Sequence, residues 1–250
     1  MSQLRYFAQA PRARRVVVIL ALTLPGLGWV VAGSAAPAQA CTSSSNNDHC
    51  YAVVFDGDTA TNDGQEANIS ASCLHVNNDA GDNFADNELW DESSDGSYWE
   101  EVGLTSGFAS DGTYYSNKTW FWADSRPGGG YNEHEPSNLS SAGTNVAYTV
   151  EIFSAGNEEW DIWGGNSFGP IGTSTSQSAT LVQGLAGTEY TSSGGADMRD
   201  AGVVNELYRE GTNGLFYSWG SDGSYGSNSG PSHYISGSWS GSAESWSYSC

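Results

Sequence analysis

Basic residues are scarce in this sequence. The 250 residues contain 8 Lys and Arg against 29 Asp and Glu, a formal net charge of −21 at pH 7. Four of the basic residues and none of the acidic ones lie in the first 40 positions, so the remainder carries 4 − 29 = −25. Phosphate backbones and anionic lipids repel such a polyanion. The composition therefore excludes nucleic acid and membrane surfaces as partners.

Several catalytic motifs are also missing. Lys118 is the only Lys, and no Gly-rich phosphate loop with a Lys follows a strand-like run. The sequence has no G-x-S-x-G motif, and its 4 His lack zincin spacing. His134, between Glu133 and Glu135, is interpreted as a charge-paired surface residue rather than a metal ligand. A Ser-His-Asp arrangement remains open because Ser is abundant, but nothing marks one Ser as special.

The first 40 residues have the order of a secretory signal peptide. Arg12, Arg14 and Arg15 precede an apolar run over 16–32, and an A-x-A cleavage sequence follows at 38–40. Pro25 and two glycines interrupt the run, which argues against a retained membrane anchor. We therefore expect residues 1–40 to be removed and the protein to be secreted into the extracellular space.

Only 4 cysteines are present, so this is a core-stabilised fold and not a disulfide scaffold. In a secreted chain they imply two disulfides, with three pairings available. We favour Cys50 with Cys73, because each lies in a strand-like run that is able to pair with the other. Cys41 would then pair with Cys250.

The fold class follows from the hydrophobic pattern. Short β-rich runs separated by Gly, Ser, Asn and Asp recur after residue 40, and no sustained helical period is present. This predicts an all-β protein, a two-sheet antiparallel β-sandwich of the concanavalin or jelly-roll type. In the run 146–153, alternation places one set of residues toward the core, namely Val146, Tyr148, Val150 and Ile152. Residues 196–210 alone predict a short helix.

We expect a single domain after the signal peptide. The sandwich is predicted to span 41–210, and 211–250 is predicted to add strands to it. This last segment is rich in Ser and Gly but carries aromatic residues at alternating positions, which is typical of strands that bury one face. An exposed aromatic tail that binds glycans is the alternative.

Two acidic loops, 56–64 and 77–88, collect the oxygen ligands that calcium prefers. Neither has EF-hand spacing, and clusters of Asp, Asn and Gly also form ordinary turns. We therefore expect no cofactor, with calcium as the alternative.

Two carboxylates within predicted strands are the strongest candidates for chemistry. In YWEEVGL, residues 98–104, alternation places Trp99, Glu101 and Gly103 on the outer face if the aliphatic residues face the core. Glu100 is then expected at the strand edge with its charge in solvent. In LAGTEYTSS, Glu189 shares a face with a glycine. Two carboxyl groups that converge across a sheet raise one pKa and hold a water between a base and an acid.

The order of these motifs resembles the glutamic peptidases of the eqolisin and neprosin groups. The likeness covers about residues 97–192 and rests on WEEVGLTSGF, WFWADSRP, VAYTVEIFS and LVQGLAGTEYTSS in sequence. It implies a β-sandwich whose concave sheet carries a Glu paired with Gln or a second Glu. Glu101 would take the first position, in a Glu-x-Gly motif, and Glu189 the second. It further implies an acid-active endopeptidase, in which one Glu activates water and the other stabilises the tetrahedral intermediate.

We therefore assign Glu189 as general base and Glu101 as its partner for the oxyanion. Trp99 and Tyr131 are predicted to line the cleft, and Glu133 is predicted to support it. The predicted substrate is a polypeptide, and the protein is expected to be a monomer. A glycosidase is an alternative that uses the same carboxylates. A non-catalytic module is another, and it would bind an extracellular glycan or cell wall through exposed aromatics, namely Trp120, Trp122 and Trp163.

Overall fold

The computed structural model describes residues 49–71, 74–76, 84–136, 148–165, 169–191, 198–199, 201–219, 225–228, 234–236 and 243–247. The predicted signal peptide lies outside these residues. So do three of the predicted disulfide cysteines, namely Cys41, Cys73 and Cys250, while Cys50 is described by its backbone alone.

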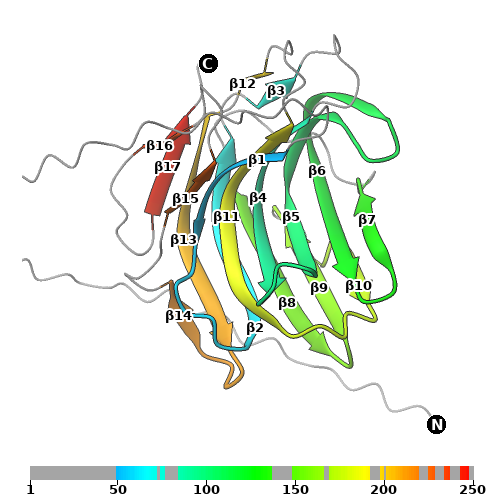
Figure 1. Cartoon of the computed structure of the whole chain (residues 1–250), viewed down its shortest axis with the longest axis vertical. Coiled ribbons are helices and arrows are strands. Elements are labelled where there is room, and N and C mark those ends of the chain that lie inside the picture. The colour runs from blue at the N-terminus through cyan, green and yellow to red at the C-terminus, as the bar shows by residue number, and fades with distance from the viewer. Residues whose placement is uncertain are drawn as a thin grey trace, which may run out of the picture. The chain divides into compact units, whose positions relative to one another are not determined.

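Two antiparallel sheets pack face to face, which confirms the predicted β-sandwich (Figure 1). The order of the seven-stranded sheet is β15 (Tyr225–Asn228), β1 (His49–Phe55), β11 (Leu181–Thr191), β4 (Phe84–Ser93), β5 (Trp99–Phe108), β6 (Tyr114–Arg126) and β7 (Gly130–His134). The order of the eight-stranded sheet is β10 (Gly172–Thr175), β9 (Glu159–Gly164), β8 (Tyr148–Gly156), β2 (Asn62–Ala71), β13 (Ala201–Gly211), β17 (Ala243–Ser247) and β16 (Tyr234–Ser236), with β14 (Phe216–Ser218) paired to β13. A third, two-stranded sheet joins β3 (His75–Val76) to β12 (Met198–Arg199).

The core lies between the two large sheets. Val102 and Leu104 of β5 are completely buried there, as are Val150 and Ile152 of β8. Burial of each such side chain stabilises the fold by roughly 1.5–3 kcal/mol. The predicted alternation is therefore confirmed for these four residues, while Val146 lies outside the described residues. The opposite face of β5 is the outer face of the seven-stranded sheet.

The helix predicted over 196–210 is wrong, because β13 occupies residues 201–211. The pairing of β13 with β2 shifts register between Asn205 and Tyr208, and Glu206 has a left-handed φ of 53°. This bulge places Val204 and Leu207, which are three residues apart, on the same buried face. A spacing of three imitates helical periodicity, which explains the error.

Segments from the C-terminal 40 residues pair with both sheets. β15 pairs with β1 in the first sheet, while β14 and β17 pair with β13 in the second. The aromatic side chains of β15, β16 and β17 lie outside the described residues. Within the described chain, no helix is long and apolar enough to cross a membrane.

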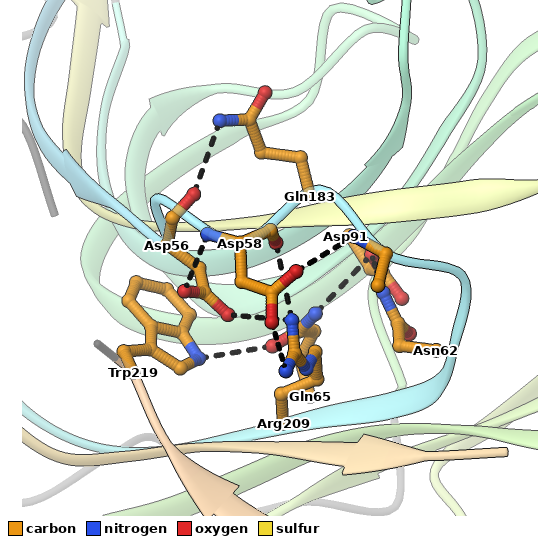
Figure 2. A network of polar contacts seen from close by, with 9 residues as sticks. Asp56, Asp58, Asn62, Gln65, Asp91, Gln183, Arg209 and Trp219 are labelled. Carbon is orange, nitrogen blue, oxygen red and sulfur yellow. Dashed lines mark hydrogen bonds and ion pairs between the residues drawn. The ribbon is translucent and has the colours of Figure 1, made fainter. Parts of the chain in front are cut away.

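Buried polar side chains form a layer between the two sheets, and this layer is part of a wider network of polar contacts (Figure 2). Asp91 accepts hydrogen bonds from Asn62 at 3.1 Å and Gln65 at 3.5 Å, and the Trp219 indole donates to Gln65 at 3.0 Å. Arg209 forms an ion pair with Asp58 at 2.6 Å. The hydrogen bonds to Asp91 join β4 of the seven-stranded sheet to β2 of the eight-stranded sheet.

Arg209 bears directly on the first predicted calcium loop, 56–64. The guanidinium lies 3.6 Å from Asp56 and hydrogen-bonds Asp58, so it supplies positive charge to the loop. Part of the second predicted loop, 77–88, is not a loop, because β4 begins at Phe84. Among the described residues, no group of three or more His, Cys, Asp or Glu side chains is arranged to hold a metal ion.

Glu100 is the clearest departure from the predicted strand edge. It has an exposed fraction of 0% and faces the core, where its carboxylate accepts a hydrogen bond from Gln177 at 2.9 Å. In register it lies between Asp91 on β4 and Asp124 on β6. Burial raises the pKa of Glu100 to about 8 and that of Asp91 to about 7. The expectation of a solvated charge was wrong because strand alternation turns Glu100 toward the opposite sheet, where Gln177 donates a hydrogen bond to it.

Candidate active site

Five carboxyl groups share the outer face of the seven-stranded sheet. Strand alternation and the pairing register place them there, and they are Asp86 and Glu88 on β4, Glu101 on β5, Glu133 on β7 and Glu189 on β11. Four of them are buried, with exposed fractions of 8% or less, and Glu133 is half-buried. Like charges this close cannot all ionise at little cost, so protons are retained on some of them.

Glu101 is the carboxyl group whose surroundings are best defined. Its Oε1 accepts a hydrogen bond from the Tyr131 hydroxyl at 3.1 Å. Burial, followed by the charge of Glu189, raises the pKa of Glu101 to about 8, while the Tyr131 hydrogen bond opposes the rise. Desolvation of the Tyr131 hydroxyl, which lies against the buried Glu101 carboxyl group, and the charge of Glu101 raise the pKa of Tyr131, which therefore stays a hydrogen-bond donor. Glu101 is consequently a neutral acid at acidic pH.

Glu189 lies two strands from Glu101, with β4 between them. In register it is opposite Asp86, whereas Glu101 is opposite Trp90 on the same strand. The two predicted catalytic residues therefore share one face and interact electrostatically. They flank β4 on opposite sides and lie opposite residues that are four positions apart along it, Asp86 and Trp90. The pKa of Glu101 responds to this neighbour, since the charge of Glu189 is the second largest cause of its rise.

The other predicted site residues surround Glu101. The ring centroids of Trp99 and Tyr131 are 6.2 Å apart, and Tyr131 is 46% exposed. The Glu133 carboxylate accepts a hydrogen bond from the Ser110 backbone N–H at 2.7 Å, which ties β7 to the turn after β5. The structure thus places these three residues on the part of the outer face that holds Glu101.

Asp86 and Glu88 were missed in the sequence because they were assigned to an acidic loop. The signal was present in DNELW, where Asp86, Glu88 and Trp90 alternate as strand residues do. Burial raises the pKa of both carboxyl groups well above the ordinary range, and neighbouring outer-face acids raise it further. The acidic face is therefore larger than the predicted pair.

The tryptophans predicted for glycan binding are not a surface platform. Trp120 is 5% exposed and Trp122 is 8% exposed, because both lie in the core between the sheets. Trp122 stacks on His134 with ring centroids 4.0 Å apart, and Trp163 is half-buried. The prediction of exposed aromatics is wrong for Trp120 and Trp122, since β6 turns its even-numbered residues toward the opposite sheet.

The protein is therefore a β-sandwich that carries a cluster of buried carboxyl groups on the outer face of its seven-stranded sheet. A solved structure of scytalido-glutamic peptidase with a transition state analog inhibitor is similar, with a TM-score of 0.55, 9% identity, and coverage of 81% of this chain and 100% of that one. A second, with a peptide based transition state analog, has a TM-score of 0.51, 10% identity, and coverage of 81% and 98%. No family model and no curated protein matches the sequence. The distant resemblance to glutamic peptidases is confirmed at the level of the fold.

Proposed function

We propose that this protein is a secreted acid endopeptidase of the glutamic type. The observation that carries the proposal is the environment of Glu101, a buried carboxyl group on the outer face that is hydrogen-bonded by Tyr131 at 3.1 Å. Its pKa of about 8 keeps it protonated in acid. A neutral carboxyl group donates a hydrogen bond, and this is what a developing oxyanion requires.

Glu189 is the general base in this proposal. In its carboxylate form it takes a proton from water as the water oxygen attacks the carbonyl carbon of a peptide bond. The oxygen of that carbonyl becomes an oxyanion, and the Glu101 O–H donates a hydrogen bond to it. Glu189 then returns the proton to the amide nitrogen as the C–N bond breaks. Trp99 and Tyr131 would contact the polypeptide beside the reacting bond.

The test is cleavage of casein at a pH of about 4, near the unperturbed pKa of Glu. The full chain is expressed with its leader, and the secreted protein is compared with Glu189→Gln and with Glu159→Gln. Glu159 is an exposed residue of β9 in the opposite sheet and serves as the control. We expect Glu189→Gln to lower kcat by at least about 100-fold, a typical contribution of general base catalysis. Cleavage that survives in Glu189→Gln contradicts the assignment.

A further inference from the structure

Glu88 occupies the position between the two proposed catalytic residues. On β4 it is opposite Gly103 of β5 on one side and Gly187 of β11 on the other. Glu101 lies two residues from Gly103, and Glu189 lies two residues from Gly187 in the opposite direction. Glu88 is therefore a diagonal neighbour of both, at a Cα separation of about 7–8 Å in regular sheet geometry.

The two flanking glycines leave the Glu88 side chain without a side-chain neighbour in its own row. At Gly103 the reason is steric, because a Cβ there would come within 2.6 Å of the Glu88 Cβ and 2.2 Å of the Asn87 carbonyl oxygen. The glycine of the Glu-x-Gly motif is thus required by β4. Because Gly103 has no side chain, β5 places no Cβ against the Glu88 side chain.

Glu88 is also an unsatisfied buried acid. Its exposed fraction is 1%, and neither Oε1 nor Oε2 has a hydrogen-bond partner within the part of the chain that the structure describes. By contrast, Glu133 accepts a hydrogen bond from Ser110 and Glu101 accepts one from Tyr131. Burial, followed by the charge of Glu101, raises the pKa of Glu88 well above the ordinary range. Its O–H is therefore retained in acid, and a buried donor without an acceptor needs an explanation.

We infer that Glu88 is a third catalytic carboxyl group of this site, which donates a hydrogen bond to the carbonyl oxygen of the peptide bond as it becomes an oxyanion. The inference rests on the peptidase function proposed above. When water attacks, the C=O electron pair moves to the oxygen, and the O–H groups of Glu88 and Glu101 both donate to it. The proton from water goes to Glu189 and then to the leaving amine, so Glu88 keeps its own proton throughout.

The experiment compares Glu88→Gln with Glu88→Met in the full-length secreted protein, using a fluorogenic peptide at a pH of about 4. Gln keeps an N–H donor at the position, whereas Met fills a similar volume without one. We expect Glu88→Met to lower kcat by about 10²–10³-fold with little change in KM, as loss of one oxyanion donor does, and Glu88→Gln to retain most of the activity. Glu159→Met in the opposite sheet is the matched control.

A second readout separates a catalytic role from a structural one. A peptide analogue with a tetrahedral alcohol in place of the scissile carbonyl should bind Glu88→Met more weakly than the wild type, while the affinity for an uncleaved peptide stays unchanged. The melting temperature of each variant at the same pH reports folding. If Glu88→Met does not fold, Glu88→Gln decides, because a folded Glu88→Gln without activity contradicts a donor role.

The outcomes distinguish the two proposals. An inactive wild type means that the peptidase function has failed. The role of Glu88 alone is overturned if the wild type is active, Glu189→Gln is inactive, and Glu88→Met keeps a kcat within about threefold of the wild type. Loss of an oxyanion donor would lower kcat far more than that. A rise in KM at unchanged kcat in Glu88→Met overturns it as well, since uniform binding does not act on the transition state.

Discussion

At the scale of single residues, burial on the outer face favours the neutral form of carboxyl groups. Glu101 is buried and receives one hydrogen bond from Tyr131, so its neutral form is favoured until the pH approaches its pKa of about 8. Glu88 is buried with no hydrogen-bond partner among the described residues, and burial raises its pKa well above the ordinary range. In acid, both groups therefore keep the O–H that a hydrogen-bond donor needs.

Replacement of Glu101 by Gln should change the pH dependence more than the rate. In the wild type, ionisation of Glu101 near its pKa of about 8 removes the O–H donor and abolishes activity on the alkaline side. The amide of Glu101→Gln donates at every pH, so the part of the alkaline decline due to Glu101 should disappear. The profile of kcat/KM against pH measures this. An unchanged alkaline limb in Glu101→Gln would show that Glu101 is not the group responsible.

At the scale of elements, close approach of β4 and β5 organises the site. Gly103 permits that approach, since a Cβ at this position would clash with the backbone of β4. The same pair of strands carries Glu88 and Glu101 on its outer face and Asp91 and Glu100 on its inner face. Any shift in this pairing therefore displaces the acidic face and the buried polar layer together.

Gly103→Ala should destabilise the protein and abolish activity. The new methyl group meets the Asn87 carbonyl oxygen at 2.2 Å, which is backbone and has little freedom to move. Overpacking of this kind costs about 1–3 kcal/mol, and the catalytic groups on both strands are displaced. Urea unfolding measures the loss. Gly169→Ala is the control, because a Cβ there meets nothing within 4 Å, and equal stability of the two variants would contradict the steric argument.

At the scale of the whole molecule, the buried acids and the excess of negative charge both make the folded state less stable as the pH rises. Asp91 and Glu100 are completely buried between the sheets, and burial raises their pKa values to about 7 and about 8. The net charge of −21 adds self-repulsion as carboxyl groups ionise. The folded state is therefore favoured in acid, where these groups are neutral.

Stability should decrease as the pH rises from about 4 to about 8. Folded Asp91 and Glu100 hold protons up to pKa values of about 7 and about 8, whereas unfolded carboxyl groups lose them near pH 4. Between these limits the folded state binds more protons, so the free energy of unfolding decreases with pH. Glu100→Gln should flatten the dependence, because an amide does not ionise. Melting temperatures from pH 3 to pH 9 test this, and a wild-type maximum near neutrality would contradict it.

Sequence patterns were enough to predict the fold class and three of the five carboxyl groups on the outer face, namely Glu101, Glu133 and Glu189. Alternation along β5 and β8 fixes which residues face the core, because strand periodicity is a local property of the backbone. It therefore placed Glu101 on the outer face with Trp99, and the order of motifs pointed to Glu189. The short helix was wrong because the bulge at Glu206 depends on pairing with β2.

Which carboxyl groups are buried, and which lie side by side, became clear from the three-dimensional arrangement of the strands. Glu100 was expected in solvent, but Gln177 from a distant segment hydrogen-bonds it inside the sandwich. Glu88 was assigned to a loop, yet strand order places it between Glu101 and Glu189. Burial and strand order are set by contacts between residues far apart in the chain, and local patterns do not carry that information. The charge of an acid in this protein is consequently a property of the fold.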